Sequence, residues 1–390
     1  MDKTGLLTPQ ARAELIEFTR DLVRIISLPG QEEEAIRFIE SRMHALGYED
    51  IAIDGMGNLV GRVGDGETSI LFDSHVDTVA VNDEAEWTHP PFGAEIDGGR
   101  LYGRGTVDMK SGAAASIYAA ALANGAGLTD GKSVYVSCSV LEEECDGENL
   151  KHMLSELDLH PDYAVICEPS ANRIALGHKG KAQLSITARG ASAHSSAPEK
   201  GVNPLYAMAE IIKRIEAKSG EFTRDKPPKR TLAISRVAST SASINAIPSE
   251  CEIYLDRRMV PGETEADIRG ELDDLVAGQD ATWGIGTLRR VSWTGMQIEY
   301  QPFHLAWRIE PDHPLARASK AAYRDWFRAE PDEFEFWDFS TNAVATVGRG
   351  IPTIGFGPGD KKLAHMIDEH CPLDQIEDAC GFYAALIGNL

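Results

Sequence analysis

The chain has 390 residues, of which 43% are hydrophobic and 25% charged, an ordinary composition for a folded protein long enough for two hydrophobic cores. Its net charge of −23 excludes nucleic acid and anionic membranes as expected partners, because both require a basic surface. No apolar run approaches the roughly 18 residues that span a bilayer, and the N-terminus lacks the apolar core of a secretory signal. The six cysteines form no C-x-x-C pair, which suits a reducing compartment, so we expect a cytoplasmic protein.

The first half of the chain predicts alternating helices and strands. Thr8 and Pro9 are expected to cap and open a helix that ends before Pro29, and a second helix is expected over 32–46. Short apolar runs predict strands at 58–63, 69–72, 134–141 and 163–167. The small residues of 112–124 predict a helix packed tightly on a sheet. This alternation predicts an α/β sheet with its functional site at the carboxyl ends of the strands.

The pattern changes after Glu168-Pro169. Strands are predicted at 184–188, 232–237, 251–255 and 287–292, with helices at 203–218 and 263–276. The resulting order, β-α-β-β-α-β, is that of a ferredoxin-like unit. A helix at 314–327, a strand at 351–356 and a helix at 373–387 follow. We therefore expect a catalytic domain formed by 1–178 and 296–390, with a second domain, 179–295, inserted into it.

Five short clusters of acidic and histidine residues lie at predicted strand ends or in the loops that follow. They are Ser74-His75-Val76-Asp77, Gly105–Lys110 with Asp108 inside it, Glu142–Glu144, Glu168-Pro169 and His365. Because the carboxyl ends of the strands meet at one edge of such a sheet, we expect one site, and mixed histidine and carboxylate ligands suit Zn²⁺. Cys145 and Cys167 lie near the acidic clusters and are alternative soft ligands, although buried packing is the preferred interpretation.

This residue set suits amide hydrolysis, which requires an activated water, a polarised carbonyl and a proton shuttle to the leaving amine. Two metal ions about 3.5–4 Å apart, bridged by a carboxylate, supply the first two needs. We expect His75 to bind a metal while Asp77 hydrogen-bonds its other ring nitrogen, and Asp108 to bridge the ions. The glutamate run offers a ligand and a general base, and Glu168 and His365 complete the ligand shells.

Several motifs together resemble a known family. They are SHVDTV, GRGTVDMKSG, the glutamate run, CEPS, HSSAPEKGVNP and GPG followed by His365. The chain resembles, over nearly its whole length, the dizinc amidohydrolase family of acetylornithine deacetylase, succinyl-diaminopimelate desuccinylase and aminoacylase. The resemblance implies a zinc-peptidase-like α/β catalytic domain, with a mixed sheet flanked by helices, and an inserted ferredoxin-like α+β dimerisation domain.

The resemblance also implies two zinc ions per subunit, for which cobalt or manganese can substitute. One ion would be held by His75, Asp108 and Glu168. The other would be held by Asp108, one glutamate of the run and His365, with His370 as the competing histidine nearby. Asp77 would orient His75.

The register within the glutamate run has two alternatives. The family pattern is a general base followed directly by a ligand, whereas here Leu141 precedes three glutamates. One alignment makes Glu142 the base and Glu143 the ligand, and the other shifts both roles by one residue. We favour the first, because Glu-Glu-acidic-Cys-Asp-Gly resembles a branch linked by name to selenium metabolism.

The resemblance further implies a homodimer in which His194 reaches the partner subunit's site and stabilises the oxyanion. Asn245 and Arg258 match positions that bind polar groups of the substrate, with Arg257 as an alternative to Arg258. Gly357, in the Gly-rich loop 355–359, is expected to approach the substrate backbone.

The sequence thus predicts a metal-dependent hydrolase that deacylates a small N-acyl amino acid. A dipeptidase or carboxypeptidase and an N-carbamoyl amino acid amidase are alternatives. A non-catalytic dimer that binds a small molecule is a more distant one.

Overall fold

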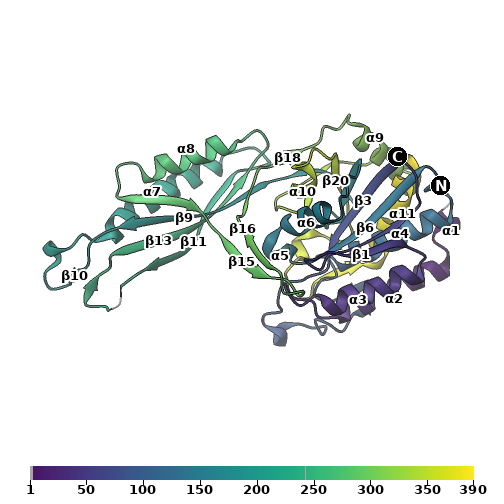
Figure 1. Cartoon of the computed structure of the whole chain (residues 1–390), viewed down its shortest axis with the longest axis horizontal. Helices are drawn as coiled ribbons and strands as arrows, with labels where there is room; N and C mark the ends of the chain where they lie inside the picture. The colour runs from purple at the N-terminus through teal and green to yellow at the C-terminus, as the bar shows by residue number, and fades with distance from the viewer. Residues whose placement is uncertain (1–2, 242) are drawn as a thin grey trace.

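A computed structural model describes residues 3–241 and 243–390 of the chain. Figure 1 shows a larger body that contains both ends of the chain and an elongated insert that projects from it. Each part has its own hydrophobic core. This arrangement is the expected fold class, a mixed sheet flanked by helices with an α+β insert. Among the described residues, no helix is both long enough and apolar enough to cross a bilayer.

The larger body is built on a sheet of nine strands, counted over the described residues. Its order is β1-β2-β6-β3-β7-β20-β8-β18, with β19 beside β8. The strands are β1 Glu49–Ile53, β2 Leu59–Val63, β3 Thr68–His75, β6 Lys132–Ser139, β7 Tyr163–Ile166, β8 Ala175–His178, β18 Trp307–Arg308, β19 Glu335–Trp337 and β20 Thr353–Gly355. β3 is parallel to β6 and β7, and β20 is parallel to β7. Four parallel carboxyl ends therefore lie side by side.

Helices flank this sheet. They are α1 Lys3–Leu6, α2 Pro9–Arg24, α3 Glu33–Ala45, α4 Lys110–Gly125, α5 Glu142–Cys145, α6 Glu148–Glu156, α9 Pro314–Phe327, α10 Ala343–Val347 and α11 Leu373–Asn389. The small side chains of α4 are almost all buried, and α4 contacts β3, β6, α2 and α11. The connections β3–α4–β6 and β6–α6–β7 step in opposite directions, so right-handed crossovers place α4 and α6 on opposite faces.

A small sheet of β4 Glu95–Asp97, β5 Arg100–Tyr102 and β21 His370–Pro372 joins two distant segments of the larger body. Three short 3₁₀ turns, counted over the described residues, are η1 Glu84–Glu86, η2 Pro198–Lys200 and η3 Lys361–Leu363. Because β21 pairs with β5, the chain around residue 369 lies against the loop that leads to Asp108. This pairing becomes important at the site.

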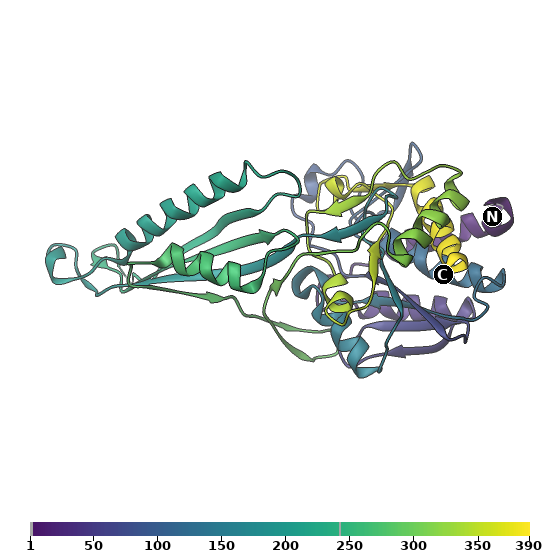
Figure 2. The same ribbon diagram turned by 90° about the horizontal axis from the view of Figure 1, so that it is seen from above.

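The insert contains a second antiparallel sheet with helices on one face, as Figures 1 and 2 show. Its elements are β9 Gly180–Arg189, α7 Pro204–Phe222, β11 Thr231–Ser239, β13 Glu250–Met259, α8 Glu265–Val276, β14 Ala281–Ile285 and β17 Phe303–His304. At its far end β10 Ala193–His194 pairs with β12 Ala246–Ile247. The order β9-α7-β11-β13-α8-β14 is the expected ferredoxin-like one.

The expected position of its last strand was wrong. β14 at Ala281–Ile285 pairs with β9, whereas β15 Leu288–Val291 pairs with β16 Gln297–Tyr300 in a separate hairpin. Both segments have strand-like composition, but Gly284 and Gly286 weaken the signal of β14, so local pattern favoured the wrong partner. The hairpin turn, which includes the expected boundary between 295 and 296, binds the larger body: the Trp293 indole donates to Gly57 O at 3.2 Å.

Candidate metal centre and catalytic site

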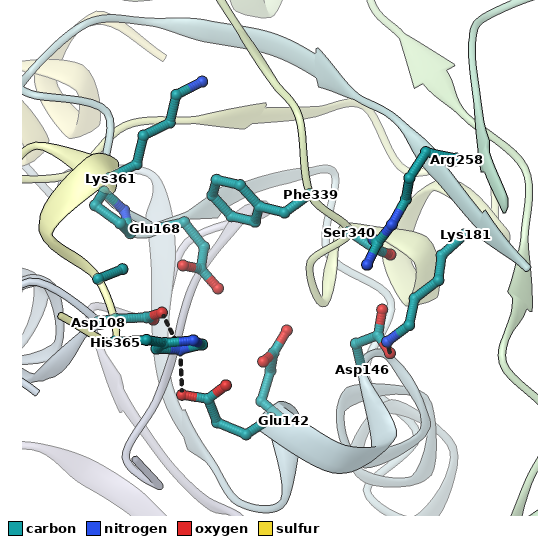
Figure 3. Close-up of a pocket in the computed structure, with 13 residues that line it drawn as sticks. Asp108, Glu142, Asp146, Glu168, Lys181, Arg258, Phe339, Ser340, Lys361 and His365 are labelled. Carbon is teal, nitrogen blue, oxygen red and sulfur yellow. Dashed lines mark hydrogen bonds and ion pairs between the residues drawn. The ribbon is translucent and has the colours of Figure 1, made fainter. Parts of the chain in front are cut away.

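The four parallel carboxyl ends bring most of the expected ligands together. His75 ends β3, Glu142 and Glu143 follow β6, Glu168 follows β7, and the chain after β20 leads to His365. Asp108 reaches the same place from the turn before α4. Asp108, Glu142, Glu168 and His365 line one cavity of about 340 Å³, which Figure 3 shows.

Asp108 lies between the two histidines. Its Oδ1 is 3.0 Å from His75 Nε2, and its Oδ2 is 3.1 Å from His365 Nε2. Glu168 Oε1 is 3.6 Å from His75 Nε2, and Glu143 Oε1 is 3.1 Å from His365 Nε2. Each histidine therefore shares Asp108 and has a further carboxylate of its own.

The electrostatics of this cluster favour bound cations. Burial raises the pKa of Glu142 and Glu168 well above the ordinary glutamate value, and neighbouring carboxylates add to the effect for both. The Asp108 and Glu143 carboxylates accept hydrogen bonds from His365, which raises the pKa of that histidine to about 10. Buried acids that repel one another, and that favour positive charge on the neighbouring histidines, fit divalent metal ions.

Asp77 orients two neighbours at once. Its backbone oxygen accepts a hydrogen bond from His75 Nδ1 at 3.0 Å, and its Oδ1 is 3.5 Å from the same nitrogen. Its carboxylate accepts from the backbone N–H groups of Glu142 at 3.1 Å and Glu143 at 3.0 Å. The residue therefore fixes the histidine ring and the start of the glutamate run together.

The three glutamates of the run point in different directions. Glu142 lines the cavity with Oε2 3.9 Å from His75 Nε2, and Glu143 contacts His365. Glu144 instead forms an ion pair with Arg290 of the hairpin and is half exposed. Leu141, at φ 59°, turns the chain before the run, and its N–H donates to Glu32 Oε1 at 3.0 Å.

Glu369 is a supporting residue that sequence reasoning missed. Its Oε1 accepts from the backbone N–H groups of Gly105, Val107 and Asp108 at 3.0, 2.8 and 3.2 Å. Its Oε2 pairs with Arg104, and burial raises its pKa to about 7. It holds the turn that presents Asp108, although no local motif marked it.

The other expected histidine and cysteine alternatives lie outside the cluster. His370 packs at a tilt against Tyr102, with Nδ1 2.8 Å from Asp368 O. Cys145 and Cys167 are fully buried, and burial raises the pKa of each thiol to about 12. Neither belongs to a group of side chains that could hold a metal ion in the described part of the chain, which favours the packing interpretation.

Arg258 lies in the cavity, whereas Arg257 and Gly357 do not line it. Arg258 reaches the cavity from β13, near Lys181 of β9 (Figure 3). Arg257 is fully buried in ion pairs with Glu263 and Glu271. Gly357 lies behind the ligands: a Cβ there would stand 2.4 Å from Glu168 O, so the glycine permits close packing that supports Glu168.

His194 and Asn245 lie together at the far end of the insert, away from the cluster (Figure 1). Ser195 N donates to Asn245 O at 2.9 Å. His194 is exposed, and its Nδ1 accepts from Ser196 N at 3.1 Å, so its Nε2 carries the proton in the neutral ring. Within one chain these two residues do not meet the candidate metal ligands.

A buried histidine–carboxylate cluster at the strand ends, opening into a cavity, defines a metal-dependent hydrolase. Residues 71–389 match the model of Peptidase family M20/M25/M40, and the chain belongs to this family. It is therefore an enzyme that hydrolyses amide bonds.

Curated relatives match nearly the whole chain. "Uncharacterized protein YgeY" of Escherichia coli is 33% identical over 380 residues, covering 96% of this chain and 94% of that protein. Succinyl-diaminopimelate desuccinylase of Cereibacter sphaeroides is 27% identical over 384 residues, covering 95% and 97%.

Solved structures share the fold. The aminopeptidase PepT of Bacillus cereus superposes with a TM-score of 0.74 at 20% identity, covering 97% of this chain and 98% of that one. A dinuclear metal binding peptidase of the M20 family from Bacillus subtilis gives 0.73 at 16% identity, covering 97% and 98%. These likenesses confirm the expected fold class.

Proposed function

We propose that the chain is a dinuclear zinc amidohydrolase that removes the acyl group from a small N-acyl amino acid. One observation carries the proposal: the two oxygens of Asp108 face His75 and His365 at 3.0 and 3.1 Å. His75, Asp108 and Glu168 would hold one ion, and Asp108, Glu143 and His365 the other. Cobalt or manganese would support the same chemistry.

Two bound metal ions would lower the pKa of a water and polarise the amide carbonyl. Glu142 lines the cavity beside the ligands without the histidine hydrogen bond that Glu143 makes, which supports its role as general base. It would take the proton of the attacking water and deliver it to the departing nitrogen. Asp77 would hold Glu142 and His75 in register through the hydrogen bonds already described.

We also propose a homodimer in which the insert, 179–295, pairs two subunits. His194 is exposed, far from its own cluster, and presents a protonated Nε2, which suits an oxyanion donor in the partner's site. Asn245 lies beside it and would contact the same substrate. Arg258, on the cavity wall of its own chain, would bind a substrate carboxylate.

A cytoplasmic location is supported by the cysteines. All six are buried and free of disulfides. Free thiols of this kind are typical of reducing compartments.

A hydrolysis screen tests the proposed activity. The purified enzyme, loaded in turn with zinc, cobalt and manganese, would be offered N-acetyl amino acids, N-carbamoyl amino acids and dipeptides. We expect fastest turnover of N-acyl amino acids and about two metal ions per chain. Faster turnover of dipeptides or carbamoyl compounds would replace the deacylase assignment, and no turnover with any metal would refute it.

A further inference from the structure

The cavity has a second polar end that the proposed metal centre leaves unused. Asp146, Lys181 and Arg258 lie together on the side of Glu142 away from Asp108 and His365 (Figure 3). Asp146 follows the glutamate run on the larger body, whereas the two cations come from β9 and β13 of the insert. The subsite therefore lies where the two parts of the chain meet.

Asp146 offers a hydrogen-bond acceptor without a donor. The residue is 3% exposed, and its Oδ1 accepts from Lys181 Nζ at 3.0 Å and from the Tyr300 hydroxyl. Its Oδ2 is buried beside the Ser340 hydroxyl, and neither atom has a hydrogen bond of good geometry among the described residues. An unpaired carboxylate oxygen is costly to bury, so a donor on a ligand would stabilise it. Burial raises the pKa of Asp146, but attraction to Lys181 and His304 and the nearby hydroxyls of Tyr300 and Ser340 outweigh it and lower the pKa to about 2, so the carboxylate is ionised at neutral pH.

Lys181 and Arg258 supply donors beside this acceptor. Arg258 donates from Nε and Nη2 to Asp256 at 2.8 and 3.2 Å, which leaves Nη1 without a partner in the described part of the chain. The ammonium of Lys181 uses one N–H on Asp146 and has two more. Lys361, the third cation of the cavity wall, is occupied by Glu335 and points away in Figure 3.

One carboxylate and two cations in the same subsite favour a ligand that carries both a positive and a negative group. A lone ammonium at Asp146 would be repelled by Lys181 and Arg258, and a lone carboxylate would leave Asp146 Oδ2 unpaired. A free α-amino acid carries both groups on one carbon and satisfies both sides. We propose that Asp146, Lys181 and Arg258 bind the zwitterionic head group of a free α-amino acid, with its ammonium on Asp146 and its carboxylate on the two cations.

This assignment rests on the proposed hydrolase activity and specifies its substrate. If the α-nitrogen is free and held at this end, the amide at the metal centre is a side-chain amide. Two sources supply such a molecule: a diamino acid acylated on its side-chain nitrogen, and the side-chain amide of an acidic amino acid. Both share the zwitterionic head group and differ in the direction of the amide.

Isomeric substrates test the proposal in the zinc-loaded wild-type enzyme. Nε-acetyl-lysine and Nα-acetyl-lysine have the same composition and net charge, but the first alone has the zwitterionic head group. We expect kcat/KM to be at least about tenfold higher for the Nε isomer, as one charged hydrogen bond provides. γ-Glutamyl methylamide tests the second source. Preference for the Nα isomer overturns the proposal without any variant.

Two variants add a structural control. Asp146→Asn should lower kcat/KM for Nε-acetyl-lysine about 10- to 100-fold and reduce the isomer preference. Glu144→Gln removes a charge two residues away, on a side chain paired with Arg290, and should leave the preference unchanged. An unaltered preference in Asp146→Asn contradicts the subsite. Lys181→Met provides the second measurement if Asp146→Asn does not fold.

Failure of the subsite and failure of the hydrolase are distinguishable. If other N-acyl amino acids are cleaved but neither Nε-acetyl-lysine nor γ-glutamyl methylamide is, the proposal is wrong and the proposed function stands. If no amide is cleaved, the subsite can still be tested by calorimetry with L-norleucine, which has the zwitterionic head group and no amide. Binding to wild type that weakens about tenfold or more in Asp146→Asn supports the subsite, and absence of binding overturns it.

Discussion

The ligand cluster and the tip of the insert hold their polar side chains in opposite ways. Around Asp108 the carboxylates are buried, and those of Asp77 and Glu369 accept hydrogen bonds from backbone N–H groups of the segments that carry the candidate ligands. At the tip, His194 is exposed and held only by Ser196 among the described residues. A buried, pre-organised cluster can bind ions within one chain, whereas an exposed histidine gains a defined environment only against another surface.

The largest effect is expected from removing the proposed general base of the cluster. Glu142→Gln should lower kcat by about 10²- to 10⁴-fold, because the amide cannot accept the proton of the attacking water. Metal content, measured by elemental analysis, should stay at the wild-type value, since Glu143 and not Glu142 contacts His365. Glu144→Gln is the matched control and should retain activity. If Glu144→Gln were the inactive variant, the second register would be correct.

The tip provides the next largest effect. His194→Ala should lower kcat about 10²- to 10³-fold, the usual loss for one oxyanion donor. His160→Ala, which removes another exposed histidine, should have no effect.

Mixing two inactive variants tests whether the tip acts across a dimer. A mixed dimer of Glu142→Gln and His194→Ala has one intact site, so an equal mixture should recover about a quarter of wild-type activity. No recovery after dissociation and reassociation would place His194 outside the partner's site.

A substitution at Glu369 tests a residue that positions a proposed ligand, Asp108, without binding metal itself. Glu369→Gln should weaken metal affinity about 10- to 100-fold, because it loosens the turn that presents Asp108. Chelator competition measures the affinity. Glu377→Gln, which breaks an ion pair with Arg12 elsewhere, is the control and should bind metal as wild type does.

The sequence predicted the elements that depend on local signals. α9 begins and ends at the residues expected, Pro314 and Phe327, because a proline at its first position and a strong apolar periodicity mark it. The clustering of most candidate ligands was also predictable, since His75, Glu143 and Glu168 lie at or just after strands whose parallel carboxyl ends meet at one edge. The placement of β14 failed, because two weak strands competed for one position and only tertiary pairing distinguishes them.

The supporting residues were not predictable, because they depend on contacts between distant segments. Glu369 lies 264 residues from Gly105, to which it is hydrogen-bonded. The directions of the three glutamates follow from the positive φ of Leu141 and from the backbone hydrogen bonds that the Asp77 carboxylate accepts. Neither feature can be inferred from the spacing of residues in the sequence. Asp146 meets Lys181 only when the insert lies against the larger body, a contact between residues 35 positions apart in the chain.

The smallest expected effect concerns the sheet that carries the cluster, and it depends on pH. His178 of β8 is fully buried, its Nδ1 donates to Lys179 O at 2.7 Å, and burial lowers its pKa to about 4. The unfolded chain, with a histidine pKa of about 6.5, binds the proton more readily, so this residue destabilises the fold as pH falls from 6.5 towards 4. The loss should be about 2 kcal/mol at pH 5. Urea unfolding of the metal-free protein at pH 7.5 and 5 should show that His178→Gln removes this part of the pH dependence, whereas His160→Gln retains it. An unchanged slope in His178→Gln would mean that His178 accepts a proton in the folded sheet.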